Sequence, residues 1–340
     1  MSLKAAPFGI SVIICTYNGA KRILYALDAL ERQIVLSDLQ WEILLIDNGS
    51  TDKTLKVANE LKNNFRKDIQ FRIIEEQISG KAHALIKGYE EAKYELMLVC
   101  DDDNGLQPAY LQCVSEIFRA NAEIGLLGGY GIADFRGEAK PIWFDKWQQS
   151  YACGKQHDNT GYLAPGDVSI WGAGSVIRKT LWLFLKENGF HFINNTGKGK
   201  MLGEDVELSH AVLFSGCNLY FDDRLWYYHD LSGGRVTREN LKKQIKNSGS
   251  TFPVIYAMAY NNSSKHKKRY NYSFFRMLIS LSINLCIQFF KKNNQFLCRH
   301  LFNQITELAF NRRKYQHIYD EIIPWIKNIK GSFPLKNTSL

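Results

Sequence analysis

The sequence predicts an α/β fold in which a mostly parallel central sheet is flanked by helices, followed by a C-terminal helical extension. Three observations support this prediction. Strand-like and helix-like runs alternate over residues 10–104, polar residues close several of the strands, and the alternation stops near Thr237. Strand–helix alternation of this kind requires parallel strands joined by right-handed crossovers.

Each element of the first half has its own signal. Apolar and β-branched runs predict strands at 10–15, 41–46, 71–74 and 95–100. Apolar residues at helical spacing predict helices at 22–33, 54–63 and 80–92. An aromatic run predicts a further strand at 225–228, and the chain beyond Thr237 is mostly helical.

Composition limits the class of protein. With 340 residues, of which 45% are hydrophobic and 23% charged, the chain can form one large domain and an accessory region. The seven cysteines form no C-x-x-C pair, which argues against a zinc site and a disulfide framework. The N-terminus has no signal-peptide core and no apolar run reaches membrane-spanning length, so we expect a cytoplasmic protein.

Three consecutive aspartates, Asp101, Asp102 and Asp103, follow the apolar run YELMLVC. They would lie at the carboxyl edge of the sheet, where open α/β folds bind ligands. Carboxylates this close raise one another's pKa and are costly unless a cation neutralises them. Hard divalent ions are the natural occupants. A solvated acidic turn is the alternative for a triplet taken alone.

Two other predicted strands also end in polar residues that suit a nucleotide. Thr16, Tyr17 and Asn18 close the first strand, and Asp47 closes the second. Tyr17 can stack on a base and Asp47 can accept a hydrogen bond from a base N–H. Any one of these ends can be an ordinary turn. Together with the acidic triplet they predict a nucleotide site.

Five segments resemble, in order and rough spacing, the inverting glycosyltransferases of family 2: SVIICTYNGA, EILLIDNGSTDKT, SGKAHALIKGYEEA, ELMLVCDDDN and GEDVEL. The resemblance covers about residues 10–230 and implies a GT-A fold with a Rossmann-like nucleotide half. We therefore expect a glycosyltransferase domain at 1–236 and a basic, mainly helical region at 237–340. The nucleotide half would span about 8–104 and the acceptor half about 105–236.

The resemblance also implies roles for single residues. It implies a divalent metal, Mn²⁺ or Mg²⁺, with Asp103 as a ligand and with Asp101 near the ribose and the metal. The expected nucleotide-binding residues are Thr16, Tyr17, Asn18, Asp47, Lys81, Asp101 and Asp102.

Glu204 and Asp205 precede a helix with apolar residues on one face. Negative charge in a first helical turn is favoured by the helix dipole, which would suffice to explain the pair. The resemblance implies instead that Asp205 is the general base that takes the proton from the acceptor hydroxyl. We expect Glu204 to orient the acceptor or to tune the pKa of Asp205.

His229 follows the aromatic strand at 225–228 and has two interpretations. A histidine at a strand end is commonly structural, whereas some GT-A enzymes use one at this place as a metal ligand. Arg235 and Arg238 have two interpretations as well, since they could clamp a diphosphate or be exposed helix-start charges.

The formal charge of +9 is concentrated after residue 240, which suggests an anionic partner. The 14-residue apolar segment at 277–290 is too short to span a bilayer. It could lie in the membrane interface, or be buried in a helical bundle or a homodimer contact.

The sequence therefore predicts a metal-dependent inverting hexosyltransferase that uses a nucleotide-diphosphate sugar, with UDP favoured. The acceptor would be a glycan or a lipid-linked molecule in cell-surface polysaccharide synthesis. We expect no nucleic-acid partner. For the basic C-terminal region, peripheral contact with the inner face of the cytoplasmic membrane and a homodimer contact stay open as alternatives. One alternative is a sugar nucleotidyltransferase. Such an enzyme should carry a glycine- and arginine-rich phosphate loop near its N-terminus, and the segment TYNGAKR does not resemble one. The other alternative is a non-catalytic nucleotide- or glycan-binding module, and the presence of both Asp103 and Asp205 argues against it.

Overall fold

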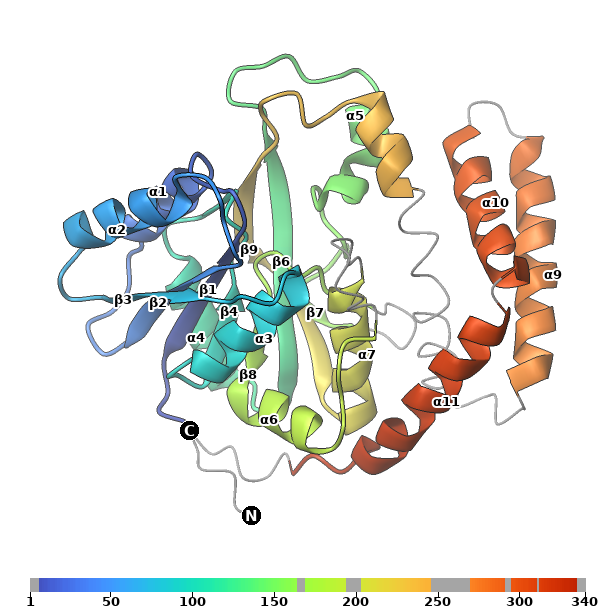
Figure 1. Cartoon of the computed structure of the whole chain (residues 1–340). Helices are drawn as coiled ribbons and strands as arrows, with labels where there is room; N and C mark the ends of the chain where they lie inside the picture. The colour runs from blue at the N-terminus through green and yellow to red at the C-terminus, as the bar shows by residue number, and fades with distance from the viewer. Residues whose placement is uncertain are drawn as a thin grey trace.

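The computed structural model describes residues 6–163, 169–193, 203–245, 270–290, 295–310 and 312–334. A nine-stranded mixed sheet forms the centre, with helices on both faces (Figure 1). The strands follow the order β3-β2-β1-β4-β8-β6-β9-β5, and β7 pairs with β9. The predicted α/β class with a C-terminal helical extension is confirmed.

The first half of the sheet is parallel, as predicted. Its strands are β1 (Ile10–Thr16), β2 (Trp41–Asp47), β3 (Gln70–Glu75) and β4 (Leu96–Val99). The crossover helices are α1 (Ile23–Glu31), α2 (Thr54–Asn64) and α3 (Lys81–Glu91). Because β1 pairs in parallel with both β2 and β4, the carboxyl ends of these three strands share one edge of the sheet.

The second half of the sheet is mixed. It contains β5 (Asn104–Leu106), β6 (Ile124–Asp134), β7 (Gly161–Tyr162), β8 (Val176–Arg178) and β9 (Asn218–Asp230). Its helices are α4 (Tyr110–Ala120), α5 (Phe144–Trp147), the 3₁₀ turn η1 (Gln148–Tyr151), α6 (Lys179–Glu187) and α7 (Glu204–Ser215). The strand predicted at 225–228 is the end of the much longer β9, which pairs with β6 in parallel and with β5 in antiparallel fashion.

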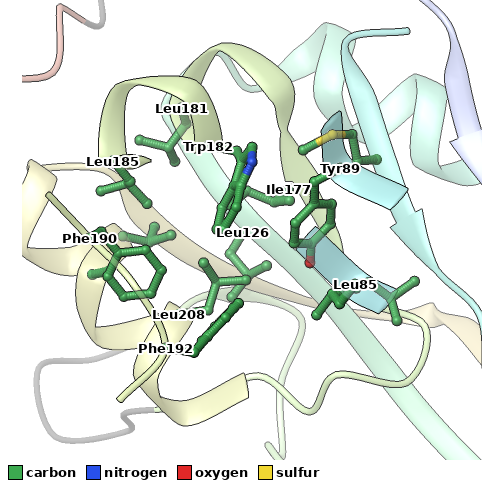
Figure 2. Packing of buried hydrophobic residues seen from close by; sticks show 14 of the residues in the cluster. Leu85, Tyr89, Leu126, Ile177, Leu181, Trp182, Leu185, Phe190, Phe192 and Leu208 are labelled. Atoms are coloured by element: carbon green, nitrogen blue, oxygen red, sulfur yellow. The ribbon is translucent and has the colours of Figure 1, made fainter. Parts of the chain in front are cut away.

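Alternating residues of each parallel strand serve the two faces of the sheet. On β1, Ile10, Val12 and Ile14 pack with α1, α2 and α4, whereas Ile13 packs with α3, α6 and α7. Figure 2 shows the second cluster, in which Trp182 of α6 lies between Tyr89 and Phe192. This packing holds α3 and α7, whose first residues form part of the site described below.

The C-terminal helices are α9 (Tyr270–Phe289), α10 (Gln295–Phe310) and α11 (Arg312–Ile329). α9 and α10 lie side by side, whereas α11 returns to α7 (Figure 1). Trp325 of α11 packs against Phe190 and Phe214 with ring centroids 5.3 and 6.0 Å apart. The last helix therefore belongs to the core of the sheet domain, and the division of the chain at residue 237 stays a prediction.

Candidate active site at the carboxyl edge of the sheet

A cleft of about 360 Å³ lies at the edge where β1, β2 and β4 end. It is bounded by these strand ends, by the start of α3 and by the end of β9. The lining residues are Cys15, Thr16, Tyr17, Arg22, Asn48, Lys81, Ala84, Asp101, Asp102, Asp103, His229 and Arg235. Most of the residues that the sequence analysis assigned to nucleotide and metal are therefore neighbours in space.

Asp102 is held by the connection that follows β1. Arg22 donates from Nε to Oδ1 at 2.8 Å and from Nη2 to Oδ2 at 2.9 Å, and Thr16 Oγ1 donates to Oδ2 at 2.7 Å. Burial raises the pKa of Asp102, and the hydrogen bond from Arg22 opposes this rise. A Cβ on Gly19 would lie 2.1 Å from Thr16 Oγ1, so only glycine permits this approach. Both oxygens of Asp102 are engaged by protein, and its contact with a nucleotide remains a prediction.

The end of β2 presents an oxygen that is ready to accept a hydrogen bond. Asp47 is 1% exposed, and its Oδ2 accepts from the Ser50 N–H at 3.2 Å. Its Oδ1 has no hydrogen-bond partner among the residues that the structure describes. Buried polar atoms rarely remain unpaired. Asp47 Oδ1 is therefore suited to a donor group on a bound molecule.

Tyr17 and Asn18 follow β1 and differ in position. Tyr17 lines the cleft and is 57% exposed, as a stacking platform would be. Asn18 adopts φ of 48°, and its Oδ1 accepts from the Thr51 N–H at 2.8 Å. The Asn18 side chain thus ties the turn after β1 to the loop after β2. Its predicted role at the nucleotide remains untested.

Lys81, the first residue of α3, joins two acidic groups. Its Nζ lies 3.0 Å from Asp101 Oδ1 and 3.5 Å from Glu204 Oε1. Burial alone would lower the pKa of Lys81, but the two carboxylates outweigh it and raise that pKa well above its ordinary value. Asn48 fixes the loop that precedes α3. Its Nδ2 donates to Ile78 O at 2.8 Å and its Oδ1 accepts from the Gly80 N–H at 2.7 Å.

Glu204 and Asp205 form the first turn of α7, next to Lys81. Asp205 lines a small pocket that shares Lys81 with the cleft. Its Oδ2 accepts from the Gly172 N–H at 3.2 Å and its Oδ1 from the Val206 N–H at 2.8 Å. Burial raises the pKa of Asp205 to about 6, and the charge of Glu204 adds to the rise. Such a pKa suits a carboxylate that must accept a proton near neutral pH.

Asp103 and His229 meet because β5 and β9 pair. The Asp230 N–H donates to Asp103 O at 2.9 Å, and His229 Nε2 lies 3.6 Å from Asp103 Oδ1. His229 Nδ1 donates to Tyr151 O at 2.8 Å, so Nε2 is the nitrogen directed at Asp103. Burial alone would lower the pKa of His229, but Asp103 raises it to about 10.

Arg235 also contacts the same carboxylate. Its Nη1 lies 2.7 Å from Asp103 Oδ2. Burial alone would raise the pKa of Asp103, but His229 and Arg235 together hold it well below its ordinary value. Asp103 is therefore a charged carboxylate that two cationic side chains neutralise.

The residues at Asp103 fit a divalent ion that is shared with a substrate. Asp103 Oδ1 and His229 Nε2 lie 3.6 Å apart and would supply an oxygen and a nitrogen ligand to such an ion. No group of three or more His, Cys, Asp or Glu residues forms a complete metal cage in the described part of the chain. An ion here would need phosphate oxygens, and Asp101 as a third ligand remains a prediction.

Sequence reasoning missed Arg22 and Asn48. Arg22 gave no signal because its partner Asp102 lies 80 residues away, and Asn48 resembles an ordinary turn residue. Four predicted residues do not line the cleft, namely Asn18, Asp47, Glu204 and Asp205.

The chain resembles known glycosyltransferases. The model of the family described as "Glycosyl transferase family 2" matches residues 11–173. The cholesterol galactosyltransferase of Borreliella burgdorferi is 31% identical over 331 residues, which cover 95% of this chain and 84% of that protein. A poly-beta-1,6-N-acetyl-D-glucosamine synthase of Staphylococcus epidermidis is 29% identical over 122 residues, 36% of this chain. The chain spans only 28% of the length of that synthase.

Two solved structures share the fold. Residues 1–349 of S. aureus TarS in complex with UDP-GlcNAc align with a TM-score of 0.52 and 13% identity, over 90% of this chain and 92% of that one. The mannosyltransferase PcManGT from Pyrobaculum calidifontis, in complex with GDP-Man and Mn²⁺, aligns with a TM-score of 0.52 and 16% identity, over 97% and 90%. The expected GT-A fold is thereby confirmed.

Proposed function

Because the chain belongs to glycosyl transferase family 2, we propose that it transfers a hexose from a nucleotide-diphosphate sugar to an acceptor hydroxyl, with inversion at the anomeric carbon. The observation that carries this proposal is Asp205, a carboxylate of raised pKa beside a cleft built for a nucleotide. Family membership leaves a sugar nucleotidyltransferase and a non-catalytic binding module without support.

The cleft supports UDP as the nucleotide of the donor. Asp47 has one oxygen free to accept, and uracil presents a single imide N–H. Guanine presents two adjacent donors, whereas Oδ1 is the one oxygen of Asp47 that has no partner among the described residues. Tyr17 stacks on the base, and Asp101 with Lys81 lies toward the ribose and diphosphate.

Mn²⁺ or Mg²⁺ would be held by Asp103 and His229, with Asp101 close by. When bound, the ion supplies positive charge that stabilises the leaving diphosphate. Arg235 stands beside the same carboxylate and adds a second cationic group to this end of the cleft.

Asp205 acts as the general base. The acceptor oxygen attacks the anomeric carbon, the bond from that carbon to the diphosphate oxygen breaks, and the hydroxyl proton moves to Asp205. The Gly172 and Val206 N–H groups hold the carboxylate in place. Glu204 keeps the pKa of Asp205 high enough to accept the proton, while Lys81 limits that rise.

For the acceptor, we propose a lipid as the first candidate, because one relative supports it. The relative that aligns over 95% of this chain, C-terminal helices included, is named for transfer of galactose to cholesterol. The polysaccharide synthase of Staphylococcus epidermidis aligns over only 36% of this chain, so a glycan acceptor in cell-surface polysaccharide synthesis is the second candidate. In the part of the chain that is described, no helix has the length and apolar character to cross a membrane. For a lipid acceptor, the proposal includes peripheral contact of the basic C-terminal region with the inner face of the cytoplasmic membrane, by the protein alone or as a homodimer.

The proposal is tested by donor and acceptor screening with the full-length protein. UDP-sugars and GDP-mannose are offered with Mn²⁺, and UDP or GDP release is measured with and without sterol or lipid extracts. Transfer from a UDP-sugar to a lipid, lost in Asp205→Asn, supports the proposal. Nucleotide release that Asp205→Asn leaves unchanged would contradict it.

A further inference from the structure

One face of α9 is a stripe of exposed apolar residues. Ile279, Ile283 and Ile287 are 60%, 55% and 51% exposed and recur every four residues, so they share one side of the helix. Cys286 and Phe290 are also exposed and extend the stripe. Leu278 and Leu281 of the same helix pack toward the core. We call the five exposed residues the α9 outer face.

The sequence around this face carries no acidic residue. Between Glu239 and Glu307 there is no Asp or Glu, whereas eleven basic residues occur in the same interval. These are Lys242, Lys243, Lys246, Lys265, Lys267, Lys268, Arg269, Arg276, Lys291, Lys292 and Arg299. Arg276 comes directly before the apolar segment at 277–290, which contains the stripe, and Lys291 and Lys292 come directly after it. Seven of them lie outside the described residues, namely Lys246, Lys265, Lys267, Lys268, Arg269, Lys291 and Lys292.

We propose that the α9 outer face docks on an anionic lipid surface, with its isoleucines entering the boundary between headgroups and acyl chains. Moving apolar side chains out of water is favourable, and the basic residues that flank the apolar segment in the sequence favour anionic headgroups. Contiguous exposed apolar residues rimmed by polar ones are a mark of interaction sites.

Charge distinguishes the lipid surface from a second copy of the chain. Pairing two α9 outer faces would bring together two basic segments that have no carboxylate to offset them. A bilayer with anionic lipids offers both the apolar layer and the opposite charge. The helix lies along such a surface, since polar Ser282, Asn284 and Gln288 interrupt its apolar character.

The proposal is independent of the catalytic role of Asp205, because the α9 outer face contains none of the site residues. It deepens the proposed lipid acceptor by naming the surface that brings the enzyme to it. If the α9 outer face does not bind lipid, the protein can still transfer sugar to a soluble acceptor. A negative result in the vesicle experiment therefore leaves the proposed catalytic activity untouched.

The test is co-sedimentation of the full-length protein with vesicles of phosphatidylcholine containing phosphatidylglycerol, compared with phosphatidylcholine alone. The variant is Ile283→Asp combined with Ile287→Asp. The matched control is Ile142→Asp, which makes the same change at a fully exposed isoleucine of the sheet domain. Melting temperature and size-exclusion elution are recorded for all three proteins, and Ile283→Leu with Ile287→Leu serves as the conservative variant.

We expect the wild type, the Ile142→Asp control and the leucine variant to bind anionic vesicles at low salt and to be released as salt rises. The double aspartate variant should lose at least about tenfold in vesicle partitioning while its melting temperature is kept. Absence of wild-type binding at low salt would overturn the proposal, as would equal binding by the double aspartate variant. Equal binding to neutral vesicles, or a loss of dimer in the variant without any vesicle binding, would also overturn it.

Discussion

Lys81 Nζ lies 3.5 Å from Glu204 Oε1, and this contact joins the nucleotide cleft to the acidic pair at the start of α7. The same ammonium group lies 3.0 Å from Asp101 Oδ1. One side chain therefore neutralises a carboxylate on each side of it. The charge of Lys81 lowers the pKa of Asp205, in opposition to burial and to Glu204.

Replacing Lys81 by methionine should shift the acid limb of the profile of kcat/KM against pH to higher pH. Without the ammonium group the pKa of Asp205 rises above about 6, so the base is protonated up to a higher pH. The measurement is kcat/KM against pH for the wild type, Lys81→Met and Lys81→Arg. We expect an upward shift in Lys81→Met alone. An unshifted limb in Lys81→Met would contradict the coupling.

Replacing Asp103 by alanine should remove the dependence of UDP binding on a divalent ion. Asp103 is the charged carboxylate opposite His229 Nε2, and both atoms are within reach of one ion. Titration calorimetry of UDP with Mn²⁺ and with EDTA checks this. Wild-type protein that binds UDP equally well in both conditions would refute the metal site.

Replacing Arg235 by alanine should strengthen the binding of Mn²⁺ in the absence of nucleotide. The guanidinium lies 2.7 Å from Asp103 Oδ2 and competes with an ion for the same carboxylate. We expect a several-fold lower Kd for Mn²⁺, measured from the electron paramagnetic resonance signal of the free ion. Arg238→Ala, an exposed arginine three residues further on, is the control and should leave the Kd unchanged. Weaker Mn²⁺ binding in Arg235→Ala would show that Arg235 assists the ion.

Replacing Asp205 by asparagine should stabilise the fold at alkaline pH. Burial raises the pKa of Asp205 to about 6, so its favourable contribution is complete below the unfolded pKa and is lost as pH rises through about 6. The side chain keeps some solvent contact, so the gain in free energy of unfolding should be about 1–2 kcal/mol at about pH 8. Urea unfolding at about pH 8 and about pH 4 checks this, with the exposed Asp158→Asn as control. A gain of equal size at both pH values would point to a cause other than ionisation.

The strand–helix pattern predicts the parallel half of the sheet well because local periodicity and burial agree there. The strands predicted at 10–15 and 41–46 are β1 and β2, each one residue longer at its end. β6 escaped prediction as one long strand because its glycines resemble a loop. A Cβ on Gly129 would lie 1.7 Å from Leu225 O, so a glycine is required at the irregularity in the pairing of β6 with β9.

The site residues that directly follow a predicted strand could be placed from the sequence. The residues that pair with partners far away in the sequence could not. Asp47, Asp101 and Asp103 follow apolar runs, so their place at one edge followed from the expected topology. The ion pair of Arg22 with Asp102 and that of Lys81 with Glu204 join residues from different elements. Such pairs are set by tertiary packing, which no local pattern encodes.

The role of Asp205 as the general base is tested most directly by measuring single-turnover sugar transfer by the Asp205→Asn variant. Asparagine keeps the size of the side chain and cannot accept the proton. We expect the transfer rate to fall by roughly 10²–10⁴, with the Kd for the UDP-sugar within a few-fold of wild type. Transfer at the wild-type rate, or loss of donor binding together with transfer, would contradict the account.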